Sequence, residues 1–109
     1  MNIVTDIAAI SKKCDPVSLE KGHEIGEILI SHLKENKGTW IGLAANQLGI
    51  NARVCAIALQ GNNTGTYKYF INPTIVDTST ETFMFREGCL SIPNKQAVTR
   101  RYRSITVKA

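Results

Sequence analysis

Apolar residues recur at helical spacing in the segment 16–37. The apolar positions of one face are Ile25, Ile28, Leu29 and Leu33. Charged residues lie mainly on the other face, at Glu20, Lys21, Glu24, Glu27, Lys34 and Glu35. Asp15 and Pro16 suit the cap and the first position of a helix, and Gly38 suits its end. The pattern predicts one amphipathic helix from about Pro16 to Lys37.

Two glycines, Gly22 and Gly26, lie one turn apart inside this predicted helix. Glycine weakens an isolated helix, because it loses more backbone freedom on folding than other residues do. The helix should therefore depend on packing against the rest of the fold. We expect the glycines to permit close contact with a neighbouring element.

After Gly49 the pattern changes from helical spacing to short β-type runs. The predicted strands are 54–59, 67–71, 74–77, 82–86 and 104–107. The turn-rich segment 60–65 predicts a hairpin between the first two. The sequence therefore predicts an α+β fold with an N-terminal helix packed on an antiparallel meander, all within a single domain of residues 1–109.

Composition and charge exclude several classes of protein. The chain has 109 residues and is 43% apolar, with no apolar run near the ~18 residues of a membrane span and no secretory signal pattern. We expect a cytoplasmic protein without a membrane partner. The net charge of +4 comes partly from basic residues near the C-terminal end. No aromatic stacking platform accompanies them, so a solvated strand face is favoured over a nucleic-acid partner.

Three cysteines, Cys14, Cys55 and Cys89, form an odd set without regular spacing, which argues against a disulfide framework. A free cysteine acts as a nucleophile or metal ligand only as a thiolate, and is otherwise a small buried apolar residue. Cys14 and Cys55 suit the second role. Cys89 follows a glycine and a carboxylate in the segment 87–93, and from the residues alone the structural role is favoured over the ligand role.

The two histidines, His23 and His32, both fall on the predicted helix. His23 and Glu27 are spaced i and i+4, as in metal-binding helices, but they belong to the polar face. A solvated histidine is the favoured interpretation of His23. His32 lies toward the apolar face and suits the core or an interface.

The segment 41–49, Ile-Gly-Leu-Ala-Ala-Asn-Gln-Leu-Gly, surrounds one amide side chain with small residues. The amide of Gln47 could donate a hydrogen bond to a charge developing on a substrate oxygen. It could equally order the loop. The segment by itself does not decide between these two roles.

Three segments in this order, 42–47, 71–73 and 87–91, resemble the peptide deformylases over essentially the whole chain. In that family a divalent metal, iron(II) or its substitutes zinc and nickel, is bound by the motif cysteine and two histidines of a His-Glu-x-x-His helix. The metal-bound water attacks the formyl group of an N-formylmethionyl nascent peptide, and the glutamate transfers the proton. The resemblance implies that Cys89 is the metal ligand here.

The same resemblance assigns roles to the other matching positions. It implies that Gln47 and the backbone N–H of Leu90 stabilise the oxyanion. It places Ile41, Gly42 and Phe85 along the cleft for the methionine side chain and the start of the peptide. It pairs Glu87 with Arg101, which would keep the cysteine loop rigid.

The sequence departs from the family pattern in two ways. Trp40 stands where the family has a glycine, which places a large ring near the cleft mouth. The sequence runs to Ala109, before the metal-binding helix. We therefore expect this chain alone to be inactive, with an open sheet face covered by a complementing segment or a second copy. The alternative is a non-catalytic deformylase-like module that binds peptides.

Overall fold

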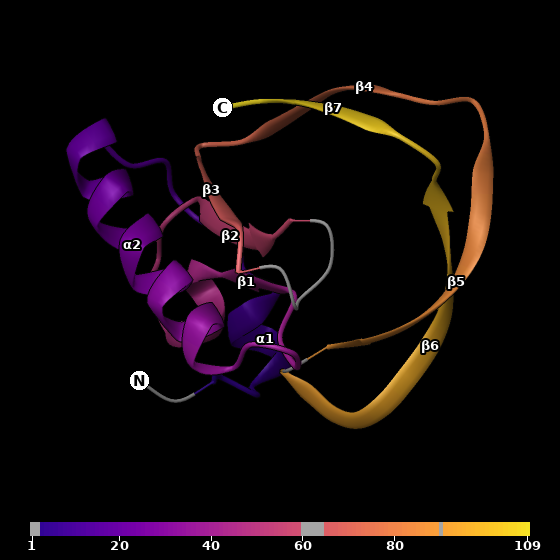
Figure 1. The fold of residues 1–109 in the computed structure, drawn as a ribbon, viewed down its shortest axis with the longest axis horizontal. Helices are drawn as coiled ribbons and strands as arrows, with labels where there is room; N and C mark the ends of the chain where they lie inside the picture. The colour runs from indigo at the N-terminus through magenta and orange to yellow at the C-terminus, as the bar shows by residue number, and fades with distance from the viewer. Residues whose placement is uncertain (1–2, 60–64, 90) are drawn as a thin grey trace.

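The computed structural model describes residues 3–59, 65–89 and 91–109. Its helical elements are α1 (Ile7–Ile10), α2 (Leu19–Glu35) and the 3-10 turn η1 (Ala45–Leu48). Its strands are β1 (Gly42–Ala44), β2 (Val54–Ala58), β3 (Tyr67–Ile71), β4 (Thr74–Thr78), β5 (Thr82–Cys89), β6 (Ile92–Tyr102) and β7 (Ile105–Lys108). The predicted α+β class, a helix with antiparallel strands, is confirmed (Figure 1).

The long helix α2 begins three residues later than predicted. Its N-cap is Ser18, whose hydroxyl accepts from the Lys21 N–H at 3.2 Å. Asp15 is instead engaged with Asn51, which bonds both its N–H and its carboxylate, at 3.1 Å and 3.0 Å. The expectation that Asp15-Pro16 starts the helix is therefore wrong, because the Asp15 carboxylate is already bound elsewhere.

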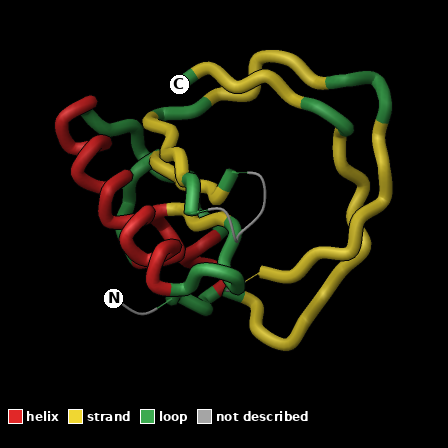
Figure 2. Tube along the Cα trace, viewed as in Figure 1, coloured by secondary structure: helices red, strands yellow, loops and turns green. Residues whose placement is uncertain are grey.

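The core lies between α2 and the three-stranded sheet β1-β2-β3. Figure 2 shows the long helix lying beside the strands of this sheet. Its buried members are Ile25, Leu29, Leu33, Leu43, Ala45, Leu48, Ala52, Val54 and Ala56. Gly22 and Gly26 face β3, which is an edge strand of this sheet. A Cβ at Gly22 would lie 2.5 Å from the Ile71 side chain, and one at Gly26 would overlap the Tyr69 ring. The expected close approach is confirmed, and it needs both glycines.

Strands β4 to β7 form two ribbons that are nested in chain order, rather than the predicted meander. β5 pairs with β6, and β4 pairs with β7 where that ribbon continues, all antiparallel (Figure 1). The longest strand, β6, and the short strand β1 were not predicted, because their sequences lack a clear alternation of apolar and polar residues. Pairing with a neighbour imposes their extended form.

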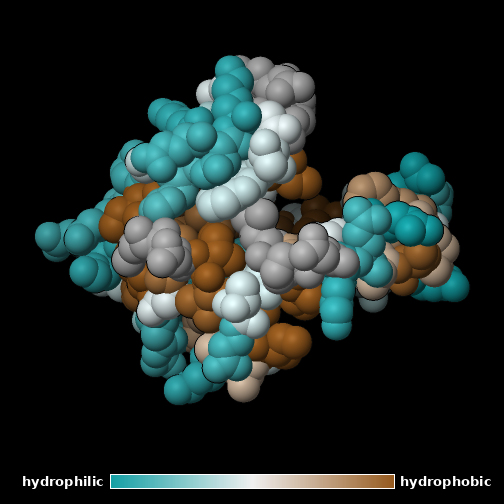
Figure 3. Space-filling view, turned by 90° about the horizontal axis from the view of Figure 1, so that it is seen from below, coloured by the Kyte–Doolittle hydropathy of each residue, from teal (hydrophilic) through white to brown (hydrophobic). Residues whose placement is uncertain are grey.

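The ribbons leave large apolar side chains in solvent. Met84 is 58% exposed, Phe85 52% and Ile75 60%, and Figure 3 shows apolar surface on both the main body and the projecting ribbon. Two-stranded ribbons are marginally stable by themselves in water. Neither helix of the described residues has the length and apolar character needed to cross a bilayer.

Candidate functional site

Gln47 is held by the backbone of its own segment. β1 leads directly into η1, and Gly49 ends that turn in the left-handed region, with φ of 79°. The Gln47 side chain folds back so that its Oε1 accepts from the Ala44 N–H at 2.9 Å. Since that bond requires the oxygen, the Nε2 donor must point the other way.

The donor of Gln47 points at the end of β5. Its Nε2 lies 3.8 Å from Cys89 Sγ and 3.3 Å from Ser91 Oγ. Ser91 is 1% exposed, so its hydroxyl is a fixed partner. The prediction that Gln47 and Cys89 meet at one cleft is confirmed by this contact and by the pocket that both line.

That pocket has a volume of about 900 Å³. Its lining residues are Thr39, Trp40, Ile41, Gly42, Gln47, Arg86, Gly88, Cys89, Ile92, Lys95 and Gln96. Ile41 and Gly42 thus line the pocket, and their contact with a substrate stays a prediction. Trp40 forms part of the wall, as expected for a ring near the cleft mouth. A Cβ at Gly42 would meet only ordinary contacts of 3.6 Å or more, with Ala56 and Ile57, so packing within the chain does not require a glycine here.

Phe85 does not line this pocket. Successive side chains of β5 point to opposite faces, so Phe85 lies on the other face of the strand from Arg86 and Gly88, which line the pocket. The Phe85 ring packs edge-on against Phe83, with centroids 6.1 Å apart. Cys89 reaches the pocket because the β5–β6 register shifts between Gly88 and Cys89. The expected place of Phe85 in a substrate cleft stays a prediction, and Leu90 lies outside the described residues.

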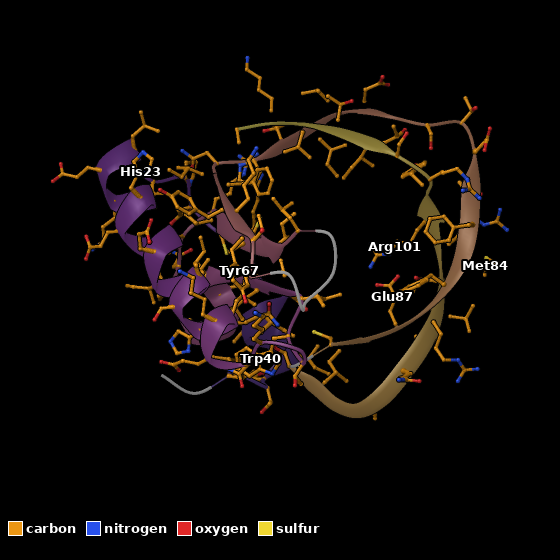
Figure 4. All side chains as sticks on the ribbon, viewed as in Figure 1. His23, Trp40, Tyr67, Met84, Glu87 and Arg101 are labelled. Atoms are coloured by element: carbon orange, nitrogen blue, oxygen red, sulfur yellow. The ribbon has the colours of Figure 1, made fainter. Side chains whose placement is uncertain are left out.

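Glu87 is anchored from the neighbouring strand. Arg101 forms an ion pair with its carboxylate through both Nε and Nη2, and the Thr99 hydroxyl donates to it as well. Figure 4 shows Glu87 and Arg101 on the concave side of the ribbon and Met84 on the convex side. The hydrogen bonds from Arg101, then that from Thr99, lower the pKa of Glu87 to about 2. The expected pairing of Glu87 with Arg101 is present.

Glu87→Gln is expected to change how stability depends on acid. The folded-state pKa of Glu87 is about 2, below its pKa in the unfolded chain. The ion pair with Arg101 therefore stabilises the fold at pH values above the unfolded-state pKa, and this contribution is lost as the pH falls toward 2. The variant should be less stable at pH 7, and its stability should fall less between about pH 4.5 and pH 2. Urea unfolding at several pH values measures both.

Glu81→Gln is the matched control for that experiment. Glu81 pairs with Arg103 at 3.4 Å, but its side chain is 75% exposed, so solvent screens the pair. Its substitution should leave the acid dependence close to that of the parent chain. Parallel stability curves for the parent and Glu87→Gln would contradict the assigned role of the carboxylate.

The other thiols and the histidines lie elsewhere. Cys55 sits half-buried in β2, and burial raises its pKa, which disfavours the thiolate. His23 is exposed, as expected, and its Nδ1 lies 2.5 Å from the Tyr69 hydroxyl, with the rings edge to face. His32 is half-buried near the end of α2. These contacts assign His23 a structural partner in β3.

The described residues do not by themselves fit a catalytic metal. Across residues 3–59, 65–89 and 91–109, no three His, Cys, Asp or Glu side chains gather as a metal site. A catalytic site of this kind takes about three protein ligands and a water. Cys89 is exposed at the pocket and offers one of them.

Two polar residues of the site were not assigned from the sequence. Ser91 contacts the Gln47 donor, and Thr99 donates to Glu87. Ser91 follows Cys89 within the same motif, so the motif contained a signal for it. Thr99 could be found only from the pairing of β5 with β6, because it lies 12 residues from its partner.

The fold and the site define an α+β protein in which the side-chain amide of Gln47 in η1 and the thiol of Cys89 in β5 line one open pocket. The family model for polypeptide deformylase matches residues 2–109. The chain is 36% identical over 113 residues to the peptide deformylase of Natranaerobius thermophilus, covering 94% of this chain and 69% of that protein. It belongs to the peptide deformylase family.

Further similarities agree with that family. The chain is 38% identical over 88 residues to the peptide deformylase of Bartonella tribocorum, covering 78% of this chain and 48% of that protein. A probable peptide deformylase structure from Synechococcus phage S-SSM7 superposes with a TM-score of 0.80 at 29% identity, covering 98% of this chain and 74% of that one. The chain spans about half the length of several curated relatives that it matches.

Proposed function

We propose that residues 1–109 form one domain-like unit that supplies the peptide cleft, the amide donor and the thiolate ligand of a peptide deformylase. The reaction removes the formyl group from N-formylmethionyl nascent peptides in the cytoplasm. The observation that carries the proposal is the contact of Gln47 Nε2 with Cys89 Sγ at 3.8 Å. Two motifs 42 residues apart in sequence thus place a hydrogen-bond donor and a metal-ligating atom at one pocket.

The free edge of β1 supports the placement of the peptide. The sheet order is β1-β2-β3, so β1 is an edge strand, and Gly42 on this strand lines the pocket. An extended peptide can add to such an edge through main-chain hydrogen bonds. The exposed Ile41 and the half-buried Trp40 then offer apolar walls beside its side chains. The reacting end of the peptide would lie toward Gln47 and Cys89.

Each site residue has a distinct proposed task. Gln47 donates through Nε2 to the oxygen on which negative charge develops, and the backbone N–H of Leu90 adds a second donor. Cys89, as thiolate, is one ligand of iron(II), for which zinc or nickel could substitute. Glu87, held by Arg101, keeps the end of β5 in position.

The remaining metal ligands and the proton-transferring carboxylate are proposed to come from a further segment with a His-Glu-x-x-His sequence. The exposed apolar residues of β4 to β7 suit a surface that such a segment covers. A second copy of the chain is the other candidate cover. Docking of that segment or copy would then cover the apolar face and complete the metal site at the same time.

Complementation tests this function. Residues 1–109 alone should neither retain metal through desalting nor release formate from formyl-Met-Ala-Ser. Adding a segment that carries the two histidines and the glutamate should restore both, measured by elemental analysis and a formate assay. The same segment with both histidines replaced by alanine is the control. Tight peptide binding without formate release in the complemented assembly would favour the non-catalytic module instead.

A further inference from the structure

The described charged residues that line the pocket beside Gln47 and Cys89 are all basic. Arg86 of β5 and Lys95 of β6 both line it, and none of its described lining residues is an aspartate or glutamate. The rest of the lining is neutral, with Trp40, Ile41 and Ile92 as its large apolar members. An anionic group entering the pocket would therefore meet two cations and no like charge.

Unlike three arginines of the chain, Arg86 and Lys95 have no ion-pair or side-chain hydrogen-bond partner among the described residues. Arg101 pairs with Glu87, Arg103 with Glu81, and Arg53 donates to the Pro73 carbonyl and the Thr74 hydroxyl. Within the described part of the chain, neither Arg86 nor Lys95 makes an ion pair or a side-chain hydrogen bond. Their charges are available to a ligand.

The strand fixes how far Arg86 lies from Cys89, and the backbone of Lys95 lies beside Gly88 on the paired strand. Arg86 precedes Cys89 by three residues of β5, which is about 10 Å at the rise of an extended strand. An extended peptide covers the same distance in about three residues. A peptide whose formyl group reaches Gln47 and Cys89 and that runs along β5 would place its third residue near Arg86.

We propose that Arg86 and Lys95 form a carboxylate subsite, which makes the cleft favour formyl-Met peptides with an acidic side chain at about the third residue. The inference rests on the proposed function and adds a sequence preference to it. The chemistry recognised is a carboxylate, held by two cations beside an apolar wall. The ion pairs form at a partly open site, so salt should weaken them.

The only tryptophan of the chain, Trp40, lines the pocket and reports binding through its fluorescence. The probes are formyl-Met-Ala-Glu-amide, its neutral isostere formyl-Met-Ala-Gln-amide, and formyl-Met-Ala-Gln with a free C-terminal carboxylate. The Glu peptide should bind about tenfold tighter than the Gln amide at low salt, and this difference in affinity should narrow at high salt. The double variant Arg86→Gln, Lys95→Gln should remove the difference in affinity. Lys108→Gln, which changes a cation outside the pocket, should preserve it.

The outcomes separate the subsite from the function it rests on. Equal affinity for the Glu and Gln amides overturns the subsite and leaves the proposed function standing. A gain only for the free C-terminal carboxylate also overturns the preference for an acidic side chain. Absence of binding by every formylated peptide removes the proposed function and this inference together. A difference in affinity that survives loss of both cations shows that other residues cause it.

Discussion

Cys89→Ala in the complemented assembly is expected to lower bound metal from about one equivalent per chain to background and to abolish formate release. Cys89 is the one metal-ligating side chain that the described pocket lining supplies, so its loss leaves the site a ligand short of the usual three. Elemental analysis after desalting measures the metal. Removing a bound metal with a chelator should reproduce the variant's loss of activity.

Cys14→Ala and Cys55→Ala are the matched thiol controls. Both side chains are half-buried and lie outside the pocket, and burial raises the pKa of Cys55. Neither substitution should change the metal content. Metal retained by Cys89→Ala, or lost in Cys14→Ala, would show that the thiolate ligand has been assigned to the wrong residue.

The helix could be predicted because its signal is local. The buried positions Ile25, Leu29 and Leu33 follow a 3.6-residue period, and the structure buries all three against the sheet. Its start could not be predicted from Asp15, because the Asn51 contact that removes this cap comes from 36 residues away. Local capping signals fail where a distant residue competes for the same side chain.

The nested ribbons could not be predicted for a related reason. Predicting a meander assumes that consecutive strands pair, whereas β4 skips β5 and β6 to pair with β7. β6 carries Lys95, Gln96, Arg100 and Arg101 and offers little apolar alternation. Its extended form follows from eight register positions shared with β5, which the sequence of β6 does not reveal.

The meeting of Gln47 with Cys89 was predicted from the family resemblance rather than from periodicity. Alternation alone would have placed Cys89 on the face of Phe85 and Glu87. The register shift after Gly88 turns it to the pocket instead. Such a shift depends on how two strands pair, and for the same reason the pocket cations Arg86 and Lys95 were found only in the structure.

Gln47→Ala in the complemented assembly is expected to keep the metal and to slow turnover by about 10²–10³, the usual loss for one oxyanion donor. The Ala44 N–H fixes Oε1 at 2.9 Å, so Nε2 is already aimed at the site before substrate binds. A donor held in place beforehand stabilises developing charge without reorganising. The loss should therefore appear mainly in kcat rather than in KM.

Gln47→Glu separates this donor role from loop ordering. A glutamate keeps the length of the side chain and an oxygen for the Ala44 N–H, but it cannot donate from the position of Nε2 when ionised. If donation matters, Gln47→Glu should lose as much turnover as Gln47→Ala while remaining as stable as the parent chain in urea. If Gln47 only orders η1, Gln47→Glu should retain most of the activity that Gln47→Ala loses. Steady-state kinetics on formyl-Met-Ala-Ser, with metal content measured for each variant, decides between the two.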